Sequence, residues 1–120
     1  MSKSAEPVTI FHNPGCGTSR NVLAAIREAG YAPTVVEYLK TGWTRPKLEA
    51  LLKAMKASPR DILRVRGTPA AELGLDQPSA GDDAILTAMV AHPNLVERPI
   101  VTSGKGAALC RPADKVTALL

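Results

Sequence analysis

Aromatic residues are scarce in this sequence, where Phe, Trp and Tyr together make up 3% of 120 positions. Proteins that bind single-stranded nucleic acid stack bases on such rings, and no stretch concentrates enough Lys and Arg to enter a duplex groove. Nucleic acid is therefore not an expected partner. The formal net charge of +4 favours a small anionic ligand instead.

Cysteine is also scarce, with Cys16 and Cys110 as the two positions. Two thiols are too few for a disulfide scaffold, and no Cys/His cluster has the spacing of a zinc site, so no bound metal or cofactor is expected. No apolar run approaches the roughly 20 residues of a membrane-spanning helix, and residues 1–6 lack the apolar core of a signal peptide. We expect a cytoplasmic protein with no membrane partner.

One chemically distinctive stretch is present, the sequence HNPGCGTSR at residues 12–20. A β-branched and aromatic run precedes it, and apolar residues at helical spacing follow it. Cys16 therefore lies where a helix is expected to begin, and the free backbone N–H groups and dipole of such a helix favour a thiolate. Glycines on both sides leave the sulfur uncovered. We predict that Cys16 is a nucleophile rather than a buried, inert cysteine.

The spacing of apolar and turn residues predicts one α/β domain over residues 1–120. The expected elements are strands at 8–12 and 34–39, a helix at 18–29 between them, a helical insertion at about 41–93, a β-hairpin at 99–110 and a final helix from 111 onward. A helix of this length between two strands predicts that the strands are parallel. The thiol loop then lies beyond the carboxyl end of the first strand, where α/β sheets tend to carry ligands.

Capping residues divide the insertion into several helices. Thr44 is expected to begin a helix that buries Leu48, Leu51, Leu52 and Met55. Ser58-Pro59 and Thr68-Pro69 are each expected to begin a short helix. A last helix is expected to bury Ile85, Leu86, Met89 and Val90 and to end at His92-Pro93.

This order of elements, with cysteine at the first helix, is typical of a thioredoxin-like domain. Members with two thiols in this loop carry Cys-x-x-Cys, but the matching segment here is Cys16-Gly17-Thr18-Ser19. The thiol that regenerates Cys16 must therefore come from elsewhere. A phosphatase loop would need Cys-x5-Arg, and Val22 at that position excludes it.

Three segments together resemble the glutaredoxin-dependent arsenate reductase family: residues 12–20, Arg98-Pro99-Ile100-Val101 and Leu109-Cys110-Arg111-Pro112. The resemblance covers essentially the whole chain. It implies a thioredoxin-like mixed sheet with an inserted helical lobe, with Pro99 as a cis-proline beside the thiol. It also implies that arsenate is reduced to arsenite at Cys16, with glutathione as co-substrate and glutaredoxin as the reducing partner.

The same resemblance implies that Arg64, Arg98 and Arg111 bind the oxyanion. Arginine suits this role because a guanidinium presents paired N–H donors to the oxygens of a tetrahedral anion. Arg98 and Arg111 each precede a proline that restricts the local backbone. Arg64, taken alone, is better explained as ordinary surface charge.

Further residues near this chemistry have a functional or a structural interpretation. His12 and Ser19 are candidates for tuning the thiolate, or they serve the loop and helix around it. Cys110 is expected to be a buried filler rather than a resolving thiol. Glu97, which precedes Arg98, is a possible competitor for that guanidinium, and residues 65–71 have no assigned function.

Two other functions remain compatible with this fold. One is a regulator similar to the Spx-type proteins, which contact RNA polymerase. Those regulators share a Cys-x-x-Cys redox switch, and this chain lacks it because Ser19 stands in place of the second cysteine. The other is a related thiol oxidoreductase that acts on glutathionylated proteins.

Overall fold

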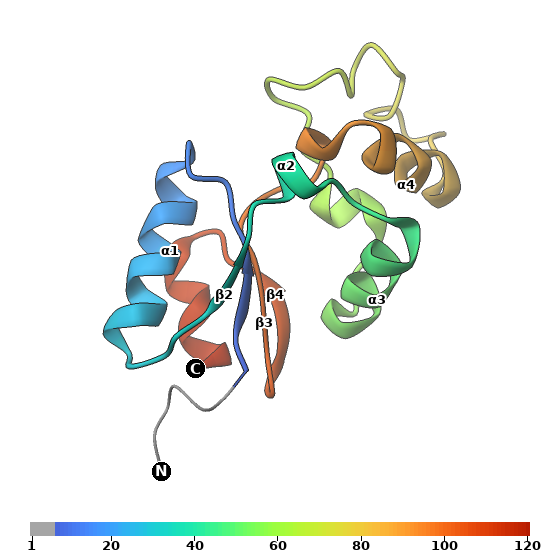
Figure 1. Ribbon diagram of the computed structural model, residues 1–120. Helices are drawn as coiled ribbons and strands as arrows, with labels where there is room; N and C mark the ends of the chain where they lie inside the picture. Colours follow the sequence, from blue (N-terminus) through green and yellow to red (C-terminus); the bar gives the residue numbers. More distant parts are fainter. Residues whose placement is uncertain (1–6) are drawn as a thin grey trace. The chain divides into compact units, whose positions relative to one another are not determined.

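The computed structural model describes residues 7–120, and a four-stranded mixed sheet organises its first compact unit (Figure 1). The strands are β1 (Thr9–Phe11), β2 (Thr34–Val36), β3 (Ile100–Ser103) and β4 (Gly106–Leu109), in the order β2-β1-β3-β4. β1 and β2 are parallel, whereas the β1–β3 and β3–β4 pairs are antiparallel. The predicted parallel pair, the hairpin and the mixed α/β sheet are thus confirmed.

One face of this sheet is covered by α1 (Gly17–Glu28) and by the 3-10 helix η4 (Ala113–Leu119), which lie beside each other (Figure 1). The centre of the sheet pairs Ile10 with Val101, and both side chains are fully buried. Val22 and Ile26 of α1 pack into the same core, four positions apart on one helical face. This packing fixes the start of α1 against the end of β1.

Two predictions for the first unit are wrong in detail. The second strand ends at Val36 rather than residue 39, because α2 (Tyr38–Thr41) follows. The N–H groups of Lys40 and Thr41 donate to the carbonyl of Glu37 at 2.9 and 3.1 Å, so this backbone is satisfied locally and not by a neighbouring strand. The final helix is of the 3-10 type and begins at Ala113, because the backbone of Pro112 is still extended.

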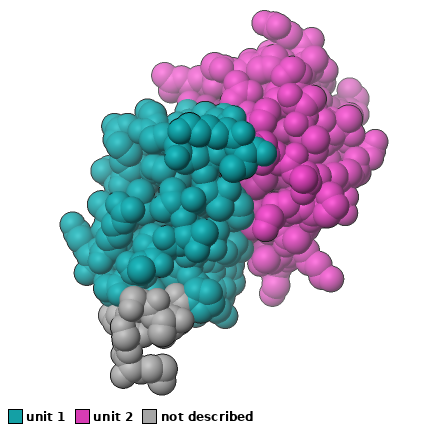
Figure 2. Space-filling view, in the orientation of Figure 1, with its two compact units in different colours: residues 1–41, 98–120 teal, residues 42–97 magenta. Residues whose placement is uncertain are grey.

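Residues 42–97 form the second compact unit, which is drawn in its own colour in Figure 2. It contains α3 (Arg45–Met55), η2 (Pro59–Ile62), α4 (Asp82–Ala91) and η3 (Pro93–Leu95). The side chain of Thr44 accepts a hydrogen bond from the N–H of Lys47 at 3.3 Å, which confirms the predicted cap of α3. Of the predicted apolar face of that helix, Leu48, Leu51 and Leu52 are buried as expected, whereas Met55 at its last turn is only partly buried.

The structure also corrects two expectations for this unit. Thr68-Pro69 begins no regular helix, although the Thr68 hydroxyl accepts from the N–H of Ala70 at 3.2 Å as a cap would. Turns form instead, because the N–H groups that follow donate to carbonyls four, three and five positions back (those of Leu73, Gly74 and Leu75) and build no uniform helical ladder. In α4, Met89 is fully buried but Val90 is 38% exposed. One position corresponds to about 100° around a helix, which carries Val90 out of the apolar stripe.

Within residues 7–120, every helix is too short or too polar to cross a lipid bilayer. In the same residues, no three His, Cys, Asp or Glu side chains are grouped as metal ligands. The expectation for residues 1–6 lies outside the described residues.

Candidate active site

Cys16 is the residue immediately before α1, as the sequence predicts. Its backbone is extended, with φ −100° and ψ 122°, and the helix starts at Gly17. The first turn of α1 contains no acidic residue that would oppose an anion. The sulfur therefore lies at the positive end of a helix whose first N–H groups lack partners within the helix.

The loop that carries Cys16 is held by its own hydrogen bonds. The side-chain oxygen of Asn13 accepts from the N–H of Gly15 at 2.9 Å, and the Asn13 carbonyl accepts from the N–H of Cys16 at 3.0 Å. The guanidinium of Arg20 donates to the carbonyl of Pro14 at 2.8 Å. A Cβ at Gly15 would lie 3.3 Å from the Asn13 oxygen, so a larger residue would crowd this turn. These hydrogen bonds fix the backbone of the loop that carries the thiol.

A buried pair of side chains joins the two ends of this loop. Nδ1 of His12, directly after β1, lies 2.6 Å from the hydroxyl of Ser19 in the first turn of α1. The same hydroxyl oxygen accepts from the N–H of Asn13 at 3.1 Å. Burial lowers the pKa of His12 and outweighs the nearby Glu37 carboxylate, which raises it. A neutral imidazole can accept the Ser19 hydroxyl proton at Nδ1, which satisfies the buried pair.

The side chain of Ser19 therefore faces His12, and Ser19 acts on the sulfur through its backbone. Its N–H is a hydrogen-bond donor to Cys16 and lowers the pKa of the thiol. Of the two interpretations that the sequence offers for Ser19, the backbone N–H matches the functional one, because it lowers the pKa of the thiol, and the hydroxyl matches the structural one, because it pairs with His12. His12 is buried behind the loop, where it holds the Ser19 hydroxyl.

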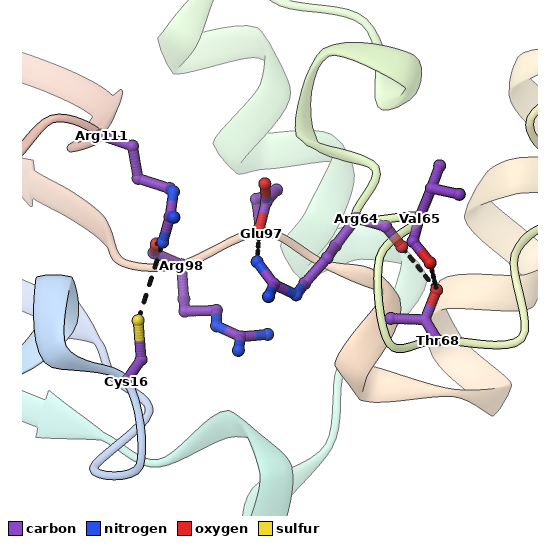
Figure 3. Close-up of polar contacts among 7 residues, drawn as sticks. All are labelled: Cys16, Arg64, Val65, Thr68, Glu97, Arg98 and Arg111. Atoms are coloured by element: carbon purple, nitrogen blue, oxygen red, sulfur yellow. Dashed lines mark hydrogen bonds and ion pairs between the residues drawn. The ribbon is translucent and has the colours of Figure 1, made fainter.

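Two arginines from the far end of the chain meet Cys16. Nη1 of Arg111 lies 3.7 Å from the Cys16 sulfur and 3.2 Å from the carbonyl oxygen of Arg98 (Figure 3). Nε of Arg98 is buried and has no hydrogen-bond partner among residues 7–120. Such an unpaired buried donor is energetically unfavourable and marks a place where an acceptor is needed. The peptide bonds Arg98–Pro99 and Arg111–Pro112 are both cis, as the resemblance implies for Pro99.

These groups make Cys16 acidic. Burial raises the pKa of its thiol, but the Ser19 N–H and the guanidinium groups of Arg98 and Arg111 outweigh it and bring the pKa to about 7. A substantial fraction of Cys16 is then thiolate at neutral pH. The arrangement provides a nucleophile with positively charged N–H donors beside it, which suits attack on an oxyanion.

Cys110 has the opposite environment. It is fully buried, its thiol lies 3.7 Å from the carbonyl of Ala108, and burial raises its pKa to about 11. A thiol in this state is neutral and inaccessible at physiological pH. Its burial confirms the expectation that Cys110 fills space in the core.

Arg64 belongs to the second unit, where it forms an ion pair with Glu97. Nη1 of Arg64 lies 2.8 Å from Oε1 of Glu97, and the two side chains are 20% and 23% exposed (Figure 3). Arg64 is thus more sheltered than ordinary surface charge. Glu97, a possible competitor for Arg98 on sequence grounds, has Arg64 as its partner instead.

Two residues that shape this region carry no distinctive chemical signal in the sequence. Asn13 closes the Cys16 loop, and the signal that could have indicated it is asparagine before Pro-Gly, which is typical of a turn. Glu97 is the partner of Arg64, and no local pattern connects two residues 33 positions apart.

Comparison with known proteins places these features in a family context. The model of the ArsC family matches residues 11–119. A protein named arsenate reductase from Rhizobium meliloti is 53% identical over 94% of this chain and 81% of its own length. One from Escherichia coli (strain K12) is 45% identical over 94% of this chain and 80% of its own. The solved structure of an arsenate reductase from Vibrio cholerae superposes with a TM-score of 0.90 at 36% identity, covering 96% of this chain and 98% of that one.

Proposed function

The chain belongs to the ArsC family, and from that premise we propose that it is an arsenate reductase whose nucleophile is Cys16. Relatives named arsenate reductase at 45–53% identity over 94% of the chain support this activity. One observation carries the assignment of the nucleophile. The Cys16 thiol has a pKa of about 7, lowered by the side chains of Arg98 and Arg111, and its sulfur lies 3.7 Å from Nη1 of Arg111.

The first chemical step is attack of the Cys16 thiolate on arsenic. Arsenate carries one to two negative charges near neutral pH, so two anions must approach each other. Arg98 and Arg111 lower the cost of this approach by donating N–H groups to the arsenate oxygens. With dihydrogen arsenate, a sulfur–arsenic bond forms, one arsenic–oxygen bond breaks, and that oxygen leaves as water with both of its protons taken from the substrate. Arg64 is proposed as a third oxyanion ligand.

The second step is a two-electron reduction of the arsenic. The thiol of glutathione attacks the Cys16 sulfur, the sulfur–arsenic bond breaks, and its electron pair stays on arsenic, which leaves as arsenite. Cys16 is then in a mixed disulfide with glutathione. A glutaredoxin thiolate attacks the glutathione sulfur of that disulfide, takes the glutathionyl group as a new mixed disulfide, and releases Cys16 as the thiolate.

The need for an external thiol follows from the two cysteines of the chain. Cys110 is fully buried with a pKa of about 11, so it is not an available resolving thiol. Ser19 occupies the position of a second loop thiol, and its hydroxyl is engaged by His12. These features support glutathione and glutaredoxin as co-substrate and partner. They also disfavour a Cys-x-x-Cys switch of the Spx type.

A coupled assay tests the proposal. NADPH oxidation is followed with glutathione, glutathione reductase and glutaredoxin, with and without arsenate. We expect arsenate-dependent oxidation that requires both glutathione and glutaredoxin, and none with Cys16→Ser. Turnover of a glutathionylated peptide without any response to arsenate would favour the related thiol oxidoreductase and contradict the proposal. Full turnover with thioredoxin and thioredoxin reductase in place of glutathione, glutathione reductase and glutaredoxin would contradict only the proposed reductants.

A further inference from the structure

We propose that Glu97 is a positioning residue that holds the guanidinium of Arg64 ready for the oxyanion. This inference rests on the proposed function, because it assigns a task to a neighbour of one of the proposed oxyanion ligands. The observation behind it is the contact of 2.8 Å between Arg64 Nη1 and Glu97 Oε1.

The backbones of both residues are fixed relative to each other. The N–H of Arg64 donates to the carbonyl of Leu95 at 2.7 Å, and the N–H of Glu97 donates to the carbonyl of Ile62 at 2.8 Å. An antiparallel bridge lies between these two hydrogen bonds. The Thr68 hydroxyl also lies 2.7 Å from the Arg64 carbonyl (Figure 3). The freedom left to Arg64 is therefore rotation within its long side chain, which is what the Glu97 contact restricts.

Partial burial makes this contact stronger than a surface ion pair. The Arg64 and Glu97 side chains are 20% and 23% exposed, so water and salt screen their attraction less than at an open surface. Another pair in the same unit, Arg45 and Glu49, has a similar length of 2.9 Å but exposures of 40% and 55%. Restriction of the side chain by Glu97 is thus expected to be greater than restriction by Glu49.

The contact leaves most of the Arg64 donors available. A guanidinium has five N–H donors, and the contact with Glu97 uses the nitrogen Nη1. Among residues 7–120, no second side-chain hydrogen bond of Arg64 is present. An arginine held at one nitrogen can still present other N–H groups to an anion, and it loses less rotamer freedom when the anion binds.

The carboxylate also has an opposing effect, because its negative charge weakens the attraction of Arg64 for an anion. If charge dominates, removal of Glu97 strengthens arsenate binding. If orientation dominates, removal weakens it. The sign of the change in KM for arsenate therefore separates the two effects, and the backbone hydrogen bonds that hold Arg64 and Glu97 beside each other favour orientation.

The experiment compares Glu97→Ala, Glu97→Gln, Arg64→Ala and the Glu97→Ala/Arg64→Ala double variant with wild type. We expect Glu97→Ala to raise KM for arsenate by roughly tenfold, the order of one charge-assisted hydrogen bond, with little change in kcat. Glu97→Gln keeps an acceptor for Arg64 and is expected to restore most of the loss. The double variant is expected to match Arg64→Ala alone, because Glu97 acts through Arg64. Glu49→Ala is the matched control and is expected to leave KM unchanged.

A lower KM in Glu97→Ala, or additive effects in the double variant, would overturn the proposal. A second measurement keeps it independent of arsenate turnover. In ¹⁵N spectra of the free protein, the Nε–H signal of Arg64 is expected to lose order in Glu97→Ala but not in Glu97→Gln, at equal thermal stability. An Arg64 signal that stays ordered in Glu97→Ala would refute positioning. Absence of arsenate turnover in the wild type would instead refute the proposed function.

Discussion

Arg111→Lys is the substitution that most directly tests how the protein uses its arginines. The Nη1 of Arg111 lies 3.7 Å from the Cys16 sulfur and 3.2 Å from the carbonyl of Arg98. Lysine retains the charge but replaces the planar fork by a single ammonium group, so it cannot reproduce paired hydrogen bonds to two arsenate oxygens. Arg98→Lys is expected to impair the reaction with arsenate for the same reason.

The magnitude follows from the hydrogen bond that lysine cannot make. One charge-assisted hydrogen bond contributes about 1.5–3 kcal/mol, which corresponds to roughly a ten- to hundredfold decrease in kcat/KM for arsenate. Loss of a hydrogen-bond donor destabilises the Cys16 thiolate, while the burial of the sulfur stays the same. The pKa of the Cys16 thiol is therefore expected to rise above its value of about 7. Both effects originate from the same guanidinium, and they should therefore appear together.

Two assays at fixed ionic strength measure these effects. Initial rates in the glutaredoxin-coupled reaction give kcat/KM, and the rate of iodoacetamide alkylation against pH gives the Cys16 pKa. Lys105→Ala is the control, because Lys105 is exposed in the β3–β4 turn, 3.1 Å from the carbonyl of Leu120. If Arg111→Lys and Lys105→Ala had equal effects on both quantities, Arg111 would act only as general positive charge and the geometric argument would fail.

The remaining predictions concern the thiol and its loop. Cys16→Ser is expected to abolish turnover without unfolding the protein, whereas Cys110→Ser should retain it, and the reverse result in the coupled assay would contradict the assignment. Alkylation of wild-type Cys16 should accelerate as the pH rises through about 7, because the thiol, with its lowered pKa, ionises to the reactive thiolate in that range. A midpoint near 8.5, the free-cysteine value, would show that the loop does not activate the sulfur. Ser19→Ala leaves the N–H of Asn13 and the Nδ1 of His12 without their shared partner, which should lower the free energy of unfolding in urea by about 1–3 kcal/mol. A decrease of less than about 0.5 kcal/mol, as at an ordinary surface site, would show that this pair does not stabilise the loop.

Local patterns in the sequence determined the elements that position the thiol. Helix α1, the parallel β1–β2 pair and the β3–β4 hairpin follow from apolar spacing and turn residues, and Cys16 lies at the start of α1 as that spacing predicts. These signals suffice because helix periodicity and capping act between residues a few positions apart. The roles of Arg98 and Arg111 were indicated by family resemblance, and spacing alone could not have assigned them.

Only the tertiary structure decided which distant groups meet. Arg111 reaches the sulfur of Cys16 across 95 positions of sequence, because β3 pairs with β1 and β4 extends the same sheet. The strand expected to run to residue 39 ends early because Glu37 accepts local backbone hydrogen bonds, a choice that β-propensity does not reveal. Glu97 has Arg64 rather than adjacent Arg98 as its partner, since an antiparallel bridge aligns the backbones of Glu97 and Arg64. Long-range pairing sets such interactions, and no local pattern encodes it.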